Sequence, residues 1–338
     1  MSSLLALSRA RFPAAVAAEK YDIFTSLVDD MIVTLFDHAE VDSLVRFRST
    51  GHRADAFVSS YLSGKLNVHL RRFVKNTAHF LDELEVCCSV ISGSSALAIL
   101  FRLPWTPQDL DIYTPRAYFY HVVAYLVHVE EYSVSFPRGS TYHVYGKVRN
   151  VARLTRSDGQ RIDVVQSASN SPLLPIASFW TTAVMNYISA TSFCIAYPHL
   201  TEANRSLIST TFMREADVQG VPQPTQHQEL LAKYRERGFD LRLAHMSWTR
   251  ESAVDAVCPG TQSVTCPLSI RYFGDRHCVT GSLRPVRTTR STRKTVNLLE
   301  EWTAVWWRGG QTCGDMCGAA GAWVGGEAFT CNRSLVLN

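Results

Sequence analysis

The chain has 338 residues, of which 46% are hydrophobic and 19% charged, with a formal net charge of +4 at pH 7. This hydrophobic share is typical of globular proteins, so intrinsic disorder along the whole chain is excluded. Because a domain usually has about 100–200 residues, the length predicts two or three domains. The small positive charge is compatible with a nucleic-acid partner but does not require one.

Cysteine usage indicates the compartment of the protein. Nine cysteines are spread over the chain, which is too sparse for the disulfide framework of a small secreted protein. The odd number, together with a start that lacks a secretory signal, predicts an intracellular protein, cytoplasmic or nuclear. Residues 1–18 have no acid and carry Arg9 and Arg11, which loosely resembles a mitochondrial presequence. A helical N-terminus is the alternative we favour.

One long stretch without charged residues raises the question of a membrane span. From Val164 to Thr201 there is no Asp, Glu, Lys or Arg. Prolines, serines and threonines interrupt it, so no window of about 18 residues is predominantly aliphatic. We therefore expect no membrane partner, and we predict a helix buried in a protein core from about Ile176 to Ala190.

The pattern from about Tyr21 to Phe73 predicts helices. Apolar residues recur at intervals of three and four, first from Ile23 to Leu35 and then in two further groups. The segment 29–62 resembles an F-box, a module of three short helices, although Asp30-Met31 stands in place of the family's Leu-Pro opening. The resemblance implies a helical module over 21–80 and a Skp-type adaptor as partner. The alternative is a plain helical cap on the next domain.

The following segments alternate between strand and helix patterns. Short β-favouring runs are separated by amphipathic stretches, and an Asp-Gly pair between two such runs is typical of a β-hairpin. Together they predict an α/β (α+β) domain with a small mixed sheet, completed by helices at 176–190 and 206–220. The predicted elements before those helices are strands at 87–91 and 108–113, a glycine turn at 92–95, helices at 96–103 and 118–129, and hairpin strands at 144–155 and 161–166.

Two motifs in this alternation have residues suited to chemistry. Gly93 stands at a predicted strand-to-helix turn, where the absence of a Cβ lets a phosphate approach the backbone. Ser94 and Ser95 follow it, and their amides and hydroxyls are donors at a helix N-terminus that favours an anion. Asp109 and Asp111 are two residues apart on a predicted strand, so their side chains share one face.

A metal ion would explain the paired carboxylates. Two such groups side by side repel each other unless a cation lies between them, and Mg²⁺ prefers oxygen ligands and phosphates. Asp163 lies on a hairpin strand that can pair beside Asp109–Tyr113, which would add a third carboxylate. The arrangement is typical of metal-assisted phosphoryl or nucleotidyl transfer.

These elements in this order resemble the nucleotidyltransferase superfamily of the polymerase-beta type. Its pattern is a Gly-Ser pair that opens a helix, an hDhDh strand about ten residues later and a single Asp on a later strand. The resemblance covers about Leu84 to Gln166, within a predicted domain at 84–222. It implies that Asp109, Asp111 and Asp163 bind Mg²⁺ in a two-metal site, that Asp163 helps to activate the attacking hydroxyl, and that Gly93–Ser95 hold the triphosphate of an NTP. An F-box-like leader before such a domain is similar to fungal members.

The region 223–338 contains cysteines, a basic run and a glycine-rich tail. A zinc site is one interpretation, but the spacings fit no paired zinc knuckle, so we favour free thiols. The run Arg284–Lys294 would suit nucleic acid, although a solvated linker is favoured. Trp302, Trp306 and Trp307 have the spacing of a helix face that covers a core. The residues considered for zinc are His245, Cys258, Cys266, His277, Cys278, Cys313 and Cys317.

The sequence supports three hypotheses of different kinds, of which the third is a nucleic-acid-handling module that uses the basic run Arg284–Lys294. The first is a Mg²⁺-dependent nucleotidyltransferase that moves a nucleoside monophosphate from an NTP to an unidentified hydroxyl acceptor. The second is a catalytically inactive protein of the same fold that serves as a binding or adaptor protein with an F-box-like N-terminus. Each motif alone also suits an ordinary role, because a serine can cap a helix and strand aspartates can be solvated. No lysine cluster that would grip a triphosphate is apparent, and Arg102, Arg116 and Lys147 are more typical of a solvated surface.

Overall fold

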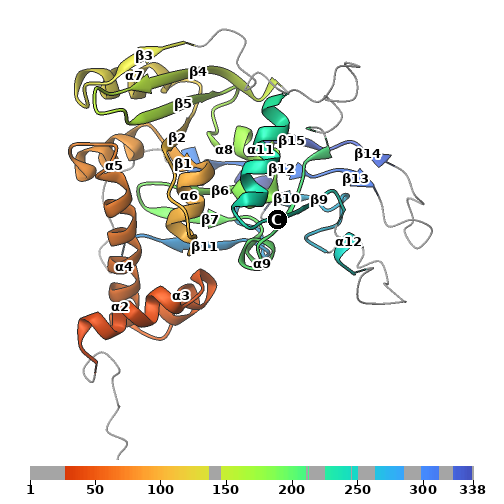
Figure 1. Cartoon of the computed structure of the whole chain (residues 1–338), viewed down its shortest axis with the longest axis horizontal. Coiled ribbons are helices and arrows are strands. Elements are labelled where there is room, and N and C mark those ends of the chain that lie inside the picture. Colours follow the sequence, from red (N-terminus) through yellow and green to blue (C-terminus); the bar gives the residue numbers. More distant parts are fainter. Residues whose placement is uncertain are drawn as a thin grey trace, which may run out of the picture. The chain divides into compact units, whose positions relative to one another are not determined.

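A computed structural model describes residues 27–136, 146–210, 212, 225–244, 246–249, 263–284, 298–311 and 323–336 (Figure 1). The chain divides into two units, Met1–Ala39 and Glu40–Asn338. In the first unit the described part is helix α2 (Asp29–His38). The second unit mixes helices with several sheets, so the predicted α+β class is confirmed at that level.

Helices precede the first strand of the second unit. They are α3 (Val41–Arg48), α4 (His52–Leu70) and α5 (Thr77–Val86). With α2 they confirm the helical prediction for this part of the chain, although residues 21–26 lie outside the described residues. On α4 the residues Val58, Leu62 and Leu66 recur every fourth position and are buried, as the apolar spacing predicts. An ion pair between Arg48 and Asp55 joins α3 to α4.

The main sheet has eight strands in the order β11-β7-β6-β1-β2-β5-β4-β3. Every neighbouring pair is antiparallel except β2 and β5, which are parallel, so the predicted mixed sheet is confirmed. The strands are β1 (Val90–Ser92), β2 (Asp109–Thr114), β3 (Ser133–Ser135), β4 (Val148–Thr155), β5 (Arg161–Ser167), β6 (Asn186–Ile188), β7 (Ser192–Ile195) and β11 (Val279–Ser282).

The predicted elements around the candidate motifs are present. Helix α6 (Gly93–Leu100) follows β1 directly, and α7 (Phe119–His128) packs against β3 and β5 (Figure 1). Strands β4 and β5 form the predicted hairpin around Asp158-Gly159. The first strand is shorter than predicted, because Cys87 is the C-cap of α5 and Cys88 has a φ of 48°. Because the chain turns at these cysteines, the strand begins at Val90.

The prediction of one buried helix from Ile176 to Ala190 is wrong. The stretch forms α8 (Leu173–Ala177), a 3₁₀ turn (Thr182–Val184) and then strands β6 and β7. These strands are buried on both faces, and such a continuous apolar run cannot be told from a buried helix by periodicity. The predicted helix 206–220 begins instead in β8 (Arg205–Leu207), and residues 213–220 lie outside the described part. Within the described residues, no helix is long and apolar enough to cross a bilayer.

The C-terminal region contributes smaller sheets. Strands β10, β12 and β15 form a three-stranded sheet, and β12 contains Trp302, Trp306 and Trp307, so the prediction that these tryptophans lie on a helix is wrong. A spacing of four residues fits one face of a strand as well as one face of a helix. The elements are α9 (Pro198–Glu202), α11 (Thr225–Glu236), β9 (Asp240–Arg242), α12 (Met246–Thr249), β10 (Arg271–Tyr272), α13 (Leu298–Glu301), β12 (Trp302–Trp307), β13 (Gly310–Gln311), β14 (Trp323–Val324), β15 (Glu327–Asn332) and a 3₁₀ turn (Arg333–Leu335).

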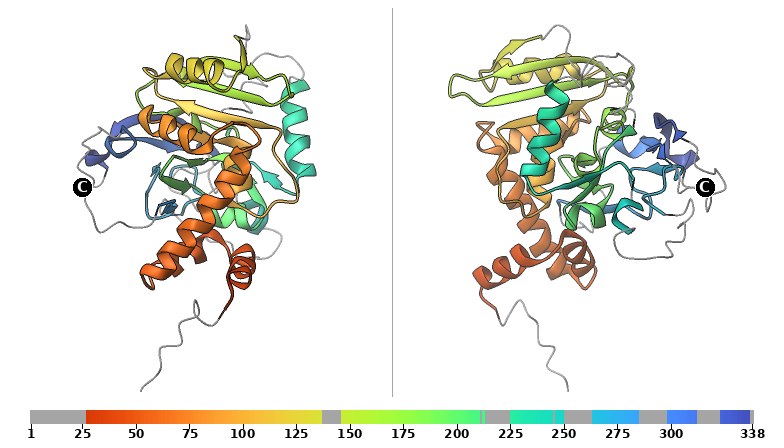
Figure 2. Two further views of the ribbon diagram at one scale, coloured as in Figure 1. Left: turned by 90° about the vertical axis from the view of Figure 1, so that its left-hand side faces the viewer. Right: turned by 45° about the vertical axis from the view of Figure 1, so that its right-hand side comes forward.

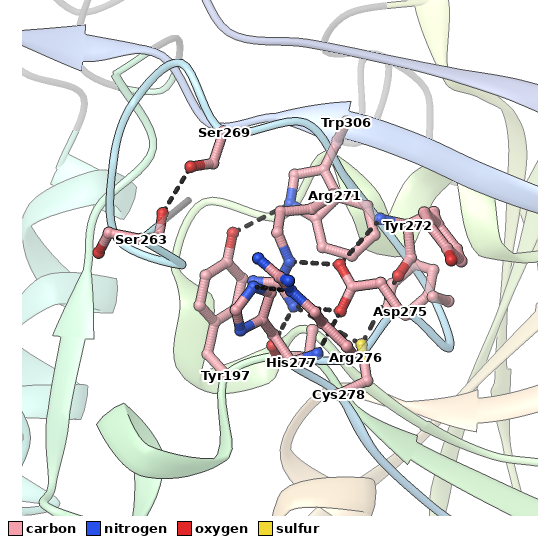
Figure 3. A network of polar contacts seen from close by, with 12 residues as sticks. Tyr197, Ser263, Ser269, Arg271, Tyr272, Asp275, Arg276, His277, Cys278 and Trp306 are labelled. Atoms are coloured by element: carbon pink, nitrogen blue, oxygen red, sulfur yellow. Dashed lines mark hydrogen bonds and ion pairs between the residues drawn. The ribbon is translucent and has the colours of Figure 1, made fainter. Parts of the chain in front are cut away.

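A buried ion pair anchors this smaller sheet to the main one (Figure 3). Arg271 of β10 is only 2% exposed; its Nε lies 2.5 Å from Asp275 Oδ2, and its Nη2 donates to the carbonyl of Ala196 at 2.8 Å. The guanidinium also lies 4.8 Å from the ring of Tyr197 and 5.6 Å from that of Trp306. Burial acts to raise the pKa of Asp275, but the hydrogen bond and charge of Arg271 outweigh it, so this pKa is lowered.

Candidate active site

A glycine turn connects β1 to α6 at the centre of the main sheet. Gly93 has a φ of +66°, in the region that L-residues with a side chain avoid. A Cβ built on Gly93 would lie 2.4 Å from Oδ2 of Asp111, which belongs to the neighbouring strand β2. The site therefore needs glycine both for its backbone conformation and for the space that the carboxylate occupies.

Replacing Gly93 by Ala should destabilise the protein. The left-handed conformation alone costs a residue with a Cβ about 1–2 kcal/mol, and the contact with Asp111 adds to that cost. Gly64→Ala is the matched control, because Gly64 lies inside α4 with nothing within 4 Å of an added Cβ. We expect this control to be neutral or to gain about 0.5–1 kcal/mol in the free energy of unfolding. Urea denaturation measures both, and equal stability of the Gly93→Ala variant and the unmodified protein would contradict the geometry.

The two serines after the glycine differ in their surroundings. The Ser95 hydroxyl donates to the carbonyl of Asp109 at 2.8 Å and lies 3.0 Å from Nε2 of His69. Because the single hydroxyl proton of Ser95 goes to Asp109, Nε2 of His69 is the donor of the second bond. Burial, with the nearby charge of Arg72, lowers the pKa of His69 to about 4, so this histidine is neutral at pH 7. The hydrogen bond of the Ser95 hydroxyl thus links α6 to β2. Ser94 follows Gly93 in the first turn of the helix.

The three predicted aspartates lie on one face of the sheet. Asp109 and Asp111 alternate with Leu110 on β2, and Asp111 is in register with Asp163 on the parallel strand β5. The side chain of Asp109 is 32% exposed and that of Asp163 is 10% exposed. The structure therefore brings together all three carboxylates and the Gly93 turn, from segments up to 70 residues apart in the sequence (163 minus 93).

Two arginines that the sequence analysis did not consider flank the carboxylates. Arg153 is in register with Asp163 across the hairpin, and its Nε lies 3.3 Å from Oδ1 of that aspartate. Arg161 is in register with Asp109, and its Nη2 lies 3.8 Å from Oδ2. Arg153 could have been found from the sequence, because the predicted hairpin can place it opposite Asp163. Opposite charges at such positions stabilise an antiparallel pair.

The carboxyl of Asp111 has a raised pKa. Burial raises its pKa well above the usual range, and the negative charges of Asp109 and Asp163 raise it further. Arg153 and Lys233 act in the opposite direction without outweighing these effects. Burial also raises the pKa of Asp163, although Arg153 partly offsets it. Ionisation of Asp111 is therefore disfavoured in this site, mainly by burial, and a cation bound beside it would favour the ionised form.

The carboxylates do not converge on one point. In the described part of the chain, an oxygen from each of the three aspartates does not lie within 4.8 Å of the other two, whereas one other group of potential ligands meets that limit. Asp111 lies between Asp109 and Asp163 and interacts electrostatically with both. The three side chains as placed therefore do not form a site for one ion bound by all three.

Helix α11 supplies a cation near the same face. Lys233 of α11 lowers the pKa of Asp111, and the buried Tyr234 beside it has a raised pKa from burial, with contributions from both Asp111 and Asp109. The ring of Tyr234 lies 5.1 Å from that of Trp180, and α11 stands beside the main sheet (Figure 2). The sequence analysis missed Lys233 because it lies beyond the predicted domain boundary at 222.

A cavity of about 180 Å³ lies further along this face. Tyr113 follows Asp111 by two residues on β2 and so shares its face, and its ring lies 5.5 Å from Phe179, which lines the cavity. The cavity is also lined by Lys147, Trp307 and Arg308. Arg308 is 8% exposed and donates to the carbonyls of Leu243 and Thr265, at 3.0 and 3.4 Å. The cavity thus combines aromatic rings with the cation Arg308, whereas the charge of Lys147 is paired with Glu327, which also lines the cavity.

Other residues considered from the sequence have different surroundings. Cys266 is a buried free thiol, and Cys278 contacts the Arg271 network. Lys147, for which a solvated role was favoured, pairs with Glu327 of β15. His245, Cys258, Cys313, Cys317 and residues 285–294 of the basic run lie outside the described residues.

Comparison with known proteins gives no relative from which a function could be transferred. No family model matches the chain, and neither a curated protein nor a solved structure is significantly similar to it.

Proposed function

We propose that the protein is a Mg²⁺-dependent nucleotidyltransferase that transfers a nucleoside monophosphate from an NTP to a hydroxyl acceptor. The observation that carries this proposal is the in-register pair Asp111 and Asp163 on parallel strands, with Asp109 on the same face and the Gly93 turn against Asp111. The three carboxylates and the glycine turn come from separate motifs, and they lie on adjacent strands at one face of the sheet.

The donor set fits divalent magnesium. Mg²⁺ takes carboxylate and phosphate oxygens, and a hard cation would favour the ionised form of Asp111, which burial and the neighbouring carboxylates disfavour. Asp109, Asp111 and Asp163 would hold the ions, with Asp111 shared between two of them. The bound ions would neutralise charge on the phosphates and on the attacking hydroxyl.

The residues around the carboxylates have separate roles in this proposal. The backbone amides that follow Gly93 at the start of α6 face an anion, as the N-terminus of a helix does. Lys233 of α11 supplies positive charge on the same side for the β- and γ-phosphates. Arg153 holds Asp163 beside Asp111, and Asp163 accepts the proton of the acceptor hydroxyl. The cavity lined by Phe179, Trp307 and Arg308 provides aromatic surface and positive charge for the acceptor.

Isothermal titration of the full chain with each of the four NTPs, with and without Mg²⁺, tests this proposal. We expect one NTP to bind in the presence of Mg²⁺, with an affinity at least about tenfold weaker when the ion is removed by EDTA. Binding that is independent of Mg²⁺, or no binding of any NTP, would contradict the proposal.

A second candidate function is that of a binding or adaptor protein without catalysis. The ion pairs of Arg153 and Arg161 with Asp163 and Asp109 favour it, because such pairs neutralise two of the three carboxylates without any metal. This function predicts no Mg²⁺-dependent NTP binding. It also predicts that a Skp-type adaptor is retained by the chain and lost when residues 29–62 are deleted.

A further inference from the structure

A second cluster of potential metal ligands lies away from the aspartates, between α5 and α7. Glu83 and Cys87 are four residues apart at the end of α5, so both side chains lie on one side of that helix. His121 is on the first turn of α7. Its Nε2 lies 3.1 Å from Oε2 of Glu83, and the thiol of Cys87 lies 4.0 Å from the same oxygen. One ligand atom from each of the three residues lies within 4.8 Å of the other two.

These distances are close to those of a zinc site. With Zn–N and Zn–O distances near 2.0 Å and Zn–S near 2.3 Å, tetrahedral ligand atoms are separated by roughly 3.3–3.7 Å. The Glu83–His121 and Glu83–Cys87 separations differ from this geometry by a few tenths of an ångström, and the third lies within the 4.8 Å limit, so side-chain rotations would have to bring the ligands together. A thiolate, an imidazole and a carboxylate form a donor set typical of Zn²⁺, whereas Mg²⁺ and Ca²⁺ prefer oxygen alone.

The three side chains differ in their exposure to solvent. Cys87 is fully buried, while the side chains of Glu83 and His121 are 24% and 57% exposed. An ion can thus reach the cluster from solvent between the exposed carboxylate and imidazole, with the sulfur beneath it. Three protein ligands would leave a fourth tetrahedral position for a water molecule.

We propose that Glu83, Cys87 and His121 bind Zn²⁺, with water as the fourth ligand. The thiol proton of Cys87 is released to solvent when the sulfur–zinc bond forms, so no oxidant or reductant is needed. The ion would join α5, which precedes the Gly93 turn, to α7, which covers β5. The site is independent of the proposed nucleotidyl transfer, because none of its residues belongs to the aspartate face.

Metal binding to the full chain tests this proposal. The protein is stripped with a chelator, dialysed and titrated with Zn²⁺ against a chromophoric chelator, and with Co²⁺ to observe the absorption of a thiolate–cobalt bond. His121→Ala and Cys87→Ser are the test variants. His128→Ala, at the other end of α7, and Cys88→Ser, next to the proposed ligand, are the matched controls.

We expect each test variant to lose one equivalent of tightly bound Zn²⁺, through an affinity at least about tenfold weaker. Cys87→Ser should also lose the thiolate–cobalt absorption of this site, and both control variants should retain it. Zn²⁺ should raise the melting temperature of the unmodified chain more than that of His121→Ala. Because His121 is exposed, its replacement leaves the core intact. Equal zinc stoichiometry, affinity and cobalt absorption in His121→Ala and the unmodified chain would overturn the proposal.

Discussion

Replacing Asp111 by Asn should reduce NTP-dependent pyrophosphate release by at least about a thousandfold, a loss at the upper end of those seen when one preorganised charge-stabilising group is removed. Asp111 is the shared ligand of the proposed ions, so its loss affects both ions at once, whereas Asp109 or Asp163 would each affect one. The measurement is release of pyrophosphate from each NTP, with cell-derived fractions supplied as the source of acceptor.

Asp158→Asn is the matched control for this measurement. Asp158 also pairs with an arginine, at 2.8 Å from Arg156, but it lies in the hairpin turn away from the carboxylate face. It should retain full activity. If Asp111→Asn releases pyrophosphate as fast as Asp158→Asn does, the proposal that these carboxylates take part in the reaction is wrong.

The same substitution should make the ion-free protein more stable at pH 7. The pKa of Asp111 is raised in the folded state, so its ionisation opposes folding, and the stability of the unmodified protein declines as pH rises from the ordinary value of 3.8 through the raised pKa. Asn carries no charge at any pH. We expect Asp111→Asn to gain at least about 1 kcal/mol at pH 7 and nothing below about pH 4. Thermal unfolding at both pH values in EDTA measures this difference, and an unchanged or lower melting temperature at pH 7 would contradict it.

Replacing Asp275 by Asn should cost about 3–5 kcal/mol in the free energy of unfolding. This substitution leaves the guanidinium of Arg271 charged, buried and without its carboxylate in the network of Figure 3. The backbone N–H groups of Tyr272 and His277 also donate to the Asp275 carboxylate. These hydrogen bonds are weaker when the acceptor is the uncharged side chain of Asn. Because Arg271 contacts Ala196, Tyr197 and Trp306, the strands on both sides of the network should loosen together.

Asp240→Asn is the control for the buried pair. Asp240 accepts from Arg242 at 2.9 Å and from Trp248 Nε1 at 2.7 Å, but its side chain is 44% exposed and an Asn oxygen can still accept a hydrogen bond, so the substitution should cost less than about 1 kcal/mol. Urea denaturation of both variants gives the comparison. A cost for Asp275→Asn as small as that for Asp240→Asn would mean that the Arg271 network does not stabilise the fold.

Local patterns predicted the centre of the main sheet well. A glycine at position 93 suits a turn with a positive φ, and the Asp158-Gly159 pair suits a tight hairpin turn. The alternation of polar and apolar residues around Asp111 suits a half-buried strand. Each of these signals lies within a few neighbouring residues. The resemblance to nucleotidyltransferases stays a prediction, because the structure gives only the placement of the motifs.

Features that depend on distant segments were not predictable in the same way. Strands β6 and β7 are buried on both faces, and their apolar runs have no period that separates strand from helix. Lys233 reaches the carboxylate face from a helix far along the chain. The zinc-binding cluster was missed because Cys87 was assigned to a strand; as the C-cap of α5, it lies one helical turn from Glu83.

Diffraction from crystals of the full chain grown with Mn²⁺ and a non-hydrolysable NTP analogue tests the shared carboxylate site most directly. We expect anomalous scattering peaks within about 2.0–2.3 Å of oxygens from Asp109 and Asp111, with the analogue's phosphates at the start of α6. Manganese bound elsewhere, with Arg153 and Arg161 still paired to their aspartates and the analogue absent from this face, would contradict it.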